Sequence, residues 1–387
     1  MVSLRSIIVP AIVIIIVSAT GQAQETINDL RFVKSDQTFS AMASTGVFLE
    51  DIDADRDFDA VISNFGQSLV LKNDGAGRFV EVQQVESLHG VLVGDINMDG
   101  KDDLLSYPST MIYLNNGRGE FKNIDNAAVR KSEQLDYCAH LVDLDNDDDL
   151  DVVTESVTGQ LISWINDGSG QFKEGMFKLP ANASFCDLNN DRAIDCIVRE
   201  SKKQLVKTGG VEKWSDREGD VGYRLYLNDG NGRFEDFSFV SVPELVRSGN
   251  RWTWFFDFDN DGDMDIVFSD RESHLARILE NDGKGNLRIG QSLTTVTYGK
   301  IGTGDLNNDE YIDLVITNRN EPAQIWINDR KGRFYDSGIR LEGNSLSQGC
   351  TIKDIDNDGD QDIFMIFYQR GSASIWYNQI VKDAYEY

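Results

Sequence analysis

The clearest chemical signal in this 387-residue chain is a nine-residue acidic string that occurs seven times. Aspartate fills positions 1, 5 and 9 of every string, position 3 is aspartate or asparagine, and position 2 is always apolar. The strings begin at Asp51, Asp95, Asp143, Asp187, Asp257, Asp305 and Asp354. Oxygen atoms at alternate residues of a tight loop can converge on one centre, which is what a hard cation needs.

Calcium fits this pattern best, because it accepts about six to eight oxygen ligands in flexible geometry, whereas magnesium prefers a strict octahedron with retained water. We expect side-chain oxygens from positions 1, 3, 5 and 9 and the backbone carbonyl of position 7, with up to seven calcium ions per chain. Solvated acidic hairpin tips are the alternative. The candidate ligands, loop by loop, are Asp51, Asp53, Asp55, Asp57 and Asp59; Asp95, Asn97, Asp99, Lys101 and Asp103; Asp143, Asp145, Asp147, Asp149 and Asp151; Asp187, Asn189, Asp191, Ala193 and Asp195; Asp257, Asp259, Asp261, Asp263 and Asp265; Asp305, Asn307, Asp309, Tyr311 and Asp313; and Asp354, Asp356, Asp358, Asp360 and Asp362.

The residue types predict differences in affinity between the loops. Position 6 should take a positive φ angle, which glycine adopts most easily, and Gly100, Gly262 and Gly359 occupy it in three strings. The loops that begin at Asp257 and Asp354 combine this glycine with aspartate at every odd position. We therefore expect these two loops to bind calcium most tightly.

The loops that begin at Asp187 and Asp305 have fewer carboxylates and no glycine at position 6, so they should bind most weakly. Replacing Asp261 by alanine should accordingly cost more thermal stability than replacing Asp309.

The formal net charge of −28 is close to the number of aspartates at the odd positions of the seven strings, which is 29. Clustered carboxylates repel one another unless a cation compensates them. The acidity is therefore interpreted as site chemistry, and nucleic acid is excluded as a partner on charge grounds.

The strings belong to a longer repeat, and their starts lie 44, 48, 44, 70, 48 and 49 residues apart. In the first copy an apolar stretch, GVFLE, precedes the string, and the runs AVIS and LVLKND and the turn GAGRF follow it. Glycine, asparagine and aspartate favour tight hairpin turns. Four short antiparallel strands repeated seven times predict an all-β, seven-bladed β-propeller.

The ends of the repeat region predict how the ring closes. The seventh copy stops after its third run at 376–378, and an unpaired strand-like segment at 30–33 precedes the first copy. We expect this N-terminal strand to complete the last blade, which removes an exposed sheet edge. One propeller domain would then cover residues 24–387, with the ring over about 27–380.

These residues resemble the FG-GAP (VCBS-type) repeat family and are similar to the calcium-binding propeller of integrin alpha subunits. The shared motif is D-x-[DN]-x-D-x-x-x-D, an apolar strand, and then NDGxGxF. The resemblance covers essentially the whole chain after its N-terminal segment and implies a calcium-binding propeller with a binding or adhesion role.

The N-terminus predicts a signal peptide over residues 1–23, with Arg5, an apolar run over 7–17 and small residues at Gly21 and Ala23. An uncleaved membrane anchor is the alternative. We expect a secreted, periplasmic or cell-surface protein that is a monomer and is not inserted in a membrane after cleavage. Cys186 and Cys196 flank one string, and either a cross-strand disulfide or buried thiols would fit that spacing.

The acidic loop joins the first and second strands of each repeat and the glycine-rich turn joins the third and fourth, so both lie on one face of the ring. The opposite face carries the variable loops, including an insertion over 201–222, and we expect a glycan or protein ligand there. Candidate ligand residues are Arg199, Arg271, Arg319 and Arg370, although solvated loop arginines would give the same pattern.

No catalytic residue is assigned. A calcium-dependent polysaccharide lyase or hydrolase is the alternative function, which the three scattered histidines do not favour.

Overall fold

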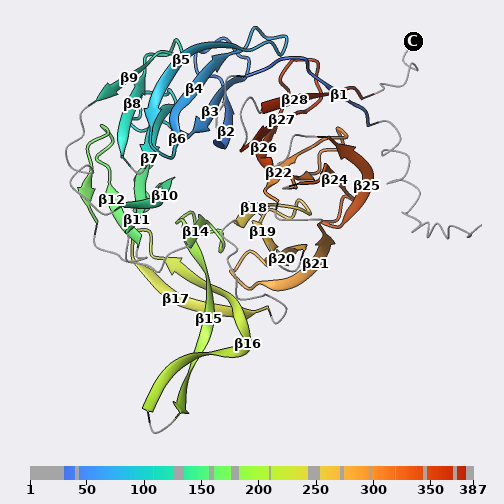
Figure 1. Ribbon diagram of the computed structural model, residues 1–387. Helices are drawn as coiled ribbons and strands as arrows, with labels where there is room; N and C mark the ends of the chain where they lie inside the picture. Colours follow the sequence, from blue (N-terminus) through green and yellow to red (C-terminus); the bar gives the residue numbers. More distant parts are fainter. Residues whose placement is uncertain are drawn as a thin grey trace, which may run out of the picture.

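The structure is a computed structural model, and it describes residues 30–39, 43–107, 109–124, 135–156, 161–175, 183–208, 211–242, 253–270, 274–295, 299–318, 320–342, 347–368 and 373–380. Within these ranges every regular element is a β-strand, and the strands form seven antiparallel sheets of four. Figure 1 shows the sheets set around a ring as the blades of a propeller. The predicted seven-bladed β-propeller is confirmed. A search of the described residues for a long apolar helix that could span a membrane found none.

The first four blades follow one another along the chain, each with its strands in sequence order. Blade one contains β2 (Ser44–Glu50), β3 (Asp59–Asn64), β4 (Gly66–Lys72) and β5 (Val80–Ser87). Blade two contains β6 (Gly90–Gly94), β7 (Asp103–Tyr107), β8 (Met111–Asn115) and β9 (Phe121–Ile124). Blade three contains β10 (Leu135–Val142), β11 (Asp151–Ser156), β12 (Leu161–Ile165) and β13 (Lys173–Glu174). Blade four contains β14 (Ala183–Cys186), β15 (Asp195–Thr208), β16 (Val211–Asn228) and β17 (Phe234–Ser241).

The last three blades complete the ring. Blade five contains β18 (Thr253–Phe256), β19 (Asp265–Asp270), β20 (Leu275–Glu280) and β21 (Arg288–Thr294). Blade six contains β22 (Ile301–Gly304), β23 (Asp313–Ile316), β24 (Ala323–Asn328) and β25 (Phe334–Leu341). Blade seven contains β26 (Ser347–Lys353), β27 (Asp362–Phe367), β28 (Ala373–Asn378) and, as its outer strand, β1 (Phe32–Lys34).

Ring closure follows the prediction. β1 pairs antiparallel with β28, with Val33 opposite Tyr377, and the two lie side by side in Figure 1. Just after β1, the side chain of Gln37 holds the glycine-rich turn of blade one, because its Nε2 donates to the Gly77 carbonyl at 2.6 Å and its Oε1 accepts from the Phe79 amide at 2.9 Å. The N-terminal segment therefore joins the last blade to the first.

The hydrophobic core is divided among the interfaces between adjacent blades. The described residues form seven buried clusters, each drawn mainly from two neighbouring blades. The second strands are buried along their length, as in β3 and β27, because a neighbouring blade covers each of their faces. This explains why these strands read as continuous apolar runs.

Blade four carries the predicted insertion as an extension of two strands. β15 and β16 continue their antiparallel pairing from Ser201 opposite Val221 to Thr208 opposite Val211, with an irregularity after Ser201. Figure 1 shows this two-stranded arm projecting away from the ring. The insertion is thus a pair of antiparallel strands in the connection between the second and third strands of its blade.

Candidate metal centres

Each acidic string forms the loop between the first and second strands of its blade; the string from Asp51 to Asp59, for example, links β2 to β3. The glycine-rich turns link the third and fourth strands, so antiparallel pairing places loops and turns on the same face. The Asn357 side chain of blade seven donates to the Gly75 carbonyl in the turn of blade one at 3.2 Å. The predicted assignment of both features to one face is confirmed.

The first aspartate of each string closes the loop on itself. In the first loop the Asp51 carboxylate accepts from the backbone amides of Asp55 and Arg56 at 3.1 and 3.0 Å. Position 6 has a positive φ angle in all seven loops, even where it is Arg56 or Glu310, so that prediction is confirmed. Position 4 also has a positive φ angle in all seven. Its signal in the sequence was the asparagine that fills it in five strings, a residue that tolerates this conformation.

Positions 2 and 9 attach the loop to the blade. The apolar residue at position 2 is buried in every loop and lies in the cluster between its own blade and the next; Ile52 and Phe258 are examples. The aspartate at position 9 accepts the backbone amide of the asparagine that ends the third strand at 2.7–2.9 Å in all seven blades. In six loops its other oxygen accepts the position-2 amide. Position 9 is therefore a structural brace in every blade.

Four loops bring carboxylate oxygens close enough to hold one metal ion. Three oxygens, one from each of three aspartates, lie within 4.8 Å of one another in each of the groups Asp51, Asp53 and Asp59; Asp143, Asp145 and Asp151; Asp257, Asp259 and Asp261; and Asp354, Asp356 and Asp362. These belong to blades one, three, five and seven, the four loops with aspartate at every odd position.

The same four loops contain a second feature that points to a cation. Their position-7 aspartates, Asp57, Asp149, Asp263 and Asp360, are only 8%, 3%, 7% and 3% exposed. One carboxylate oxygen of each is buried without a hydrogen-bond partner among the described residues. Burial, together with the neighbouring carboxylates, raises the pKa of each to about 6. A buried carboxylate that lacks a partner is costly, so these oxygens fit a cation ligand, and here the side chain of position 7 is available in addition to its carbonyl.

The other three loops place protein donors on the aspartate at position 5. In blade two, Lys101 Nζ lies 2.8 Å from Asp99 Oδ2. In blade four, Asn189 Nδ2 donates to Asp191 Oδ2 at 2.8 Å. In blade six, Arg330 Nε lies 3.0 Å from Asp309 Oδ2. Each of these loops has aspartate at only three odd positions and so carries less negative charge, and in blades two and six a lysine or an arginine compensates part of it.

One contact and one buried oxygen depart from this division. In blade one, Lys72 Nζ lies 2.7 Å from Asp53 Oδ2, so one five-aspartate loop also contacts a protein cation. In blade six, the Asn307 carbonyl oxygen is buried with no partner among the residues described. Neither feature changes the contrast at position 7, which is a buried aspartate in four loops and Lys101, Ala193 or Tyr311 in the other three.

Seven asparagines that sequence reasoning left without a role connect neighbouring blades. The side-chain amide of each donates at 2.8–2.9 Å to the position-2 carbonyl of the preceding blade's loop, as Asn73 does to Ile355 and Asn115 does to Ile52. The full set is Asn73, Asn115, Asn166, Asn228, Asn281, Asn328 and Asn378. Their regular place at the end of every third strand was the available signal.

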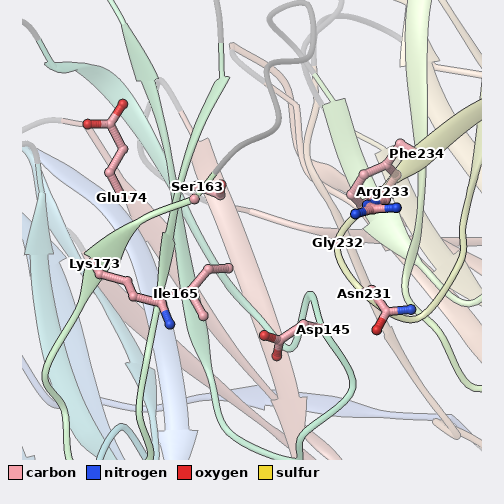
Figure 2. Close-up of a pocket in the computed structure, with 10 residues that line it drawn as sticks. Asp145, Ser163, Ile165, Lys173, Glu174, Asn231, Gly232, Arg233 and Phe234 are labelled. Carbon is pink, nitrogen blue, oxygen red and sulfur yellow. The ribbon is translucent and has the colours of Figure 1, made fainter.

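The third loop opens onto a cavity of about 860 Å³ between blades three and four. Figure 2 shows Asp145 between the β13 side, with Lys173, and the turn of blade four, with Asn231 and Arg233. β13 has two residues, whereas β5, β17 and β25 have eight. Among the described residues, this loop therefore adjoins a cavity at the side of blade three.

The remaining predicted residues are the cysteine pair and the four arginines. Cys186 and Cys196 are both free thiols, and the register pairs Cys196 with Phe185, which places the two cysteines on opposite faces of the sheet. Arg199 lies in β15 opposite Tyr223, while Arg271, Arg319 and Arg370 fall outside the described residues. The metal-competent groups found in the described ranges contain only aspartates.

A family model of the FG-GAP-like repeat matches residues 95–154, 187–268 and 305–365, together just over half of the chain. The chain belongs to the FG-GAP-like repeat family. Each matched segment of this FG-GAP-like propeller begins at the first aspartate of one acidic string and extends past the next string. Each match therefore covers one complete repeat together with the acidic string of the next repeat.

Two curated relatives of this FG-GAP-like chain are cartilage acidic protein 1 of Mus musculus, 22% identical over 382 residues, and of Xenopus tropicalis, 20% identical over 371 residues. In both cases the match covers 83% of this chain but 57% of the relative, so the chain spans just over half their length.

Solved structures support the fold alone. BBS1N, crystallised in complex with ARL6DN and soaked with mercury, superposes with a TM-score of 0.55 at 11% identity, covering 91% of this chain and 98% of that one. Saccharomyces cerevisiae Sqt1 superposes with a TM-score of 0.50 at 10% identity, covering 87% of this chain and 99% of that one.

Proposed function

We propose that this FG-GAP-like propeller is a secreted calcium-binding module that binds a glycan or protein ligand on the face opposite its acidic loops. The observation that carries the metal part is the buried position-7 carboxylate oxygen in four loops, which has no partner within the described structure. A carboxyl group in that setting either takes up a proton or, when ionised, is stabilised by a nearby cation.

Calcium is the proposed ion, and the loops of blades one, three, five and seven are its proposed sites. The odd-position aspartates of each would hold it, and the ion would supply positive charge and tie the loop together. We expect no tight site in blades two, four and six, where Lys101, Asn189 and Arg330 already contact position 5. This reduces the expected number of ions from seven to four.

Exposed apolar side chains on the face opposite the acidic loops support the binding role. Phe65, Leu88 and Tyr368 are 40%, 60% and 47% exposed there, on connections between second and third strands or between blades. The Phe65 and Tyr368 rings contact each other edge to face, with centroids 6.4 Å apart. Exposed apolar groups on the loops of a rigid ring are typical of interaction surfaces.

Calorimetric titration of the chelator-stripped mature chain with calcium tests the metal part. We expect about four bound ions and a rise in melting temperature, with a much smaller response to magnesium. No uptake of calcium would overturn the proposal, and seven tight sites would overturn the division of the loops.

Expression of the full chain with its own N-terminus, followed by N-terminal sequencing of exported protein, tests secretion and cleavage after Ala23.

A further inference from the structure

A second cavity, of about 300 Å³, lies on the axis of the ring, near the face opposite the acidic loops. The first and second strands of several blades line it. Its polar lining includes Thr45, Ser63, Tyr107, Lys300 and Gln348. Trp254 adds an aromatic side chain. Its size lies at the lower end of the range for small-molecule pockets, which suits one sugar residue or a side chain.

Lys300 places its ammonium at the wall of this cavity. It precedes β22 in blade six, and its Nζ donates to the Thr45 carbonyl of blade one at 2.8 Å. Its stem passes Gly349 of blade seven, where an added Cβ would lie 3.3 Å from the Lys300 Cδ. Gly349 has a φ angle of 145°, so glycine is favoured there on both counts. Burial lowers the pKa of Lys300 to about 8, which leaves the ammonium as the major form at neutral pH.

Three hydroxyl groups of the lining converge around Gly90, and one of them belongs to Thr45, whose carbonyl accepts from Lys300. Thr45 Oγ1 and Ser63 Oγ lie 2.9 Å apart. A Cβ at Gly90 would collide with Ser63 Oγ and would lie 2.7 Å from the Tyr107 hydroxyl and 2.9 Å from Thr45 Oγ1. The absence of a side chain at Gly90 therefore allows these hydroxyls to converge. Thr45 Oγ1 also donates to the His89 carbonyl at 3.1 Å, and Ser63 Oγ accepts the Val91 amide at 2.9 Å. A hydroxyl oxygen has two acceptor positions, so the remaining ones complement the hydroxyls of a sugar.

The charge of the cavity contrasts with that of the chain. Among the described residues that line it, Lys300 carries the one formal charge, although the chain as a whole carries −28. The acidic loops lie on the other face. A low-dielectric pocket with one cation and no lining carboxylate in the described structure favours an anion.

A row of ring contacts connects Tyr107 in the cavity lining to the exposed Phe65. Tyr107 packs against His89 with ring centroids 5.7 Å apart, and His89 packs against exposed Phe65 at 4.3 Å. The C–H faces of a pyranose ring pack well on such rings. The ammonium, the hydroxyls and the Trp254 and Tyr107 rings of the lining together offer a partner for the carboxylate, the hydroxyls and the C–H face of an acidic sugar.

We propose that the axial cavity binds a hexuronate residue of an acidic polysaccharide, with its carboxylate on the Lys300 ammonium and its hydroxyls toward Thr45, Ser63 and Gln348. This inference rests on the proposed function as a ligand-binding module and specifies its ligand.

The test is calorimetric binding of short galacturonate, glucuronate and mannuronate oligosaccharides to the calcium-saturated mature chain. Their methyl esters are the matched neutral probes, because esterification removes only the charge. For at least one of these uronates we expect the acid to bind at least about tenfold more tightly than its ester, a difference of about 1.4 kcal/mol. Lys300→Met should abolish that preference, and Lys300→Arg should retain part of it. Lys284→Met, in an exposed turn on the acidic-loop face, should leave it unchanged.

Melting temperatures of all variants show whether they fold. If Lys300→Met does not fold, Lys300→Arg still tests the role of this side chain. Equal affinity of acid and ester, or a preference that survives Lys300→Met, would overturn the inference. Binding of an acidic peptide but of no uronate would overturn the sugar assignment and leave the binding module standing. Loss of calcium binding in the separate titration would instead count against the proposed function.

Discussion

At the scale of single residues, the asparagine that ends each third strand connects the acidic loop to the rest of the ring. Its backbone amide donates to the position-9 aspartate of its own blade, and its side chain donates to the position-2 carbonyl of the preceding blade. One residue therefore couples two loops and one blade interface. Because the carbonyl is buried, loss of its partner leaves an unsatisfied acceptor.

Replacing Asn228 by alanine should lower the free energy of unfolding by about 1–3 kcal/mol, because the Leu144 carbonyl of blade three loses its 2.8 Å hydrogen bond. Denaturant unfolding in saturating calcium measures the loss. The control is Asn123→Ala, at an exposed position of β9, which should change stability by less than about 0.5 kcal/mol. Equal effects of the two substitutions would contradict the proposed bracing role.

Asp261→Ala should lower the melting temperature in calcium more than Asp309→Ala. Asp261 lies in a carboxylate group that can hold a metal, whereas Asp309 contacts Arg330. An ion at about a hundred times its dissociation constant stabilises the folded state by about 2.7 kcal/mol, which is roughly what Asp261→Ala should remove. The chelated proteins serve as the control, because the two variants should then differ little. The reverse order in calcium would contradict the ranking of the loops.

At the scale of elements, blade seven depends on a strand from the other end of the chain. β1 contributes a three-residue ladder to β28, and Leu30 and Phe32 pack in the cluster between blades six and seven. Without β1 the edge of β28 would be open to pairing with another chain.

A chain that begins at residue 36 should therefore melt at a lower temperature and aggregate, whereas a chain that begins at residue 27 should match a chain that begins at residue 24. Thermal melting and size-exclusion chromatography of the two truncations measure this. Equal stability of the two truncations would show that β1 does not stabilise the ring.

The arm of blade four should be dispensable for folding, since beyond Ser201 and Val221 its strands are registered only with each other. Joining Ser201 to Val221 through an Asn-Gly turn should change the melting temperature by no more than about 2–4 °C, the shift that about 1 kcal/mol produces in a large domain. Calcium uptake is the matched readout and should not change. Loss of cooperative melting would show that the arm packs on the ring.

At the scale of the whole molecule, burial and clustering raise the pKa of many loop aspartates. At position 7 the pKa of Asp57 rises to about 6. At position 9 the pKa rises to about 7 for Asp59, Asp151 and Asp265 and to about 8 for Asp362. Burial is the main cause in each case. Their unfolded pKa is about 3.9. Between these values the folded chain binds more protons than the unfolded chain, so its stability falls as pH rises. Buried His140, whose pKa is lowered to about 4, acts in the opposite direction but is a single group.

The chelated protein should accordingly melt at a higher temperature at pH 5.5 than at pH 7.5. Calcium should stabilise it more at pH 7.5, where it does not compete with protons. Melting curves at the two pH values, with calcium and with chelator, measure both effects. A calcium-free protein that gains stability over this interval would contradict the assignment of buried, uncompensated carboxylates.

The sequence by itself determined the architecture, because the physical signals were local and repeated. The spacing of the aspartate strings, the apolar position 2 and the Asn-Asp-Gly turns specified four strands per repeat and seven repeats. The missing fourth strand of the last repeat and the spare segment at 30–33 specified the closure. Position 6 could be assigned a positive φ angle because loop geometry depends on near neighbours.

Tertiary structure decided how the carboxylates of each loop are buried and paired, because that depends on groups that are distant in sequence. Arg330 contacts Asp309 from the turn of the same blade, Asn228 reaches the loop of another blade, and the buried state of Asp149 depends on its surroundings. The axial cavity has the same origin: Lys300 and Thr45 are 255 residues apart in the chain and meet only because the ring closes.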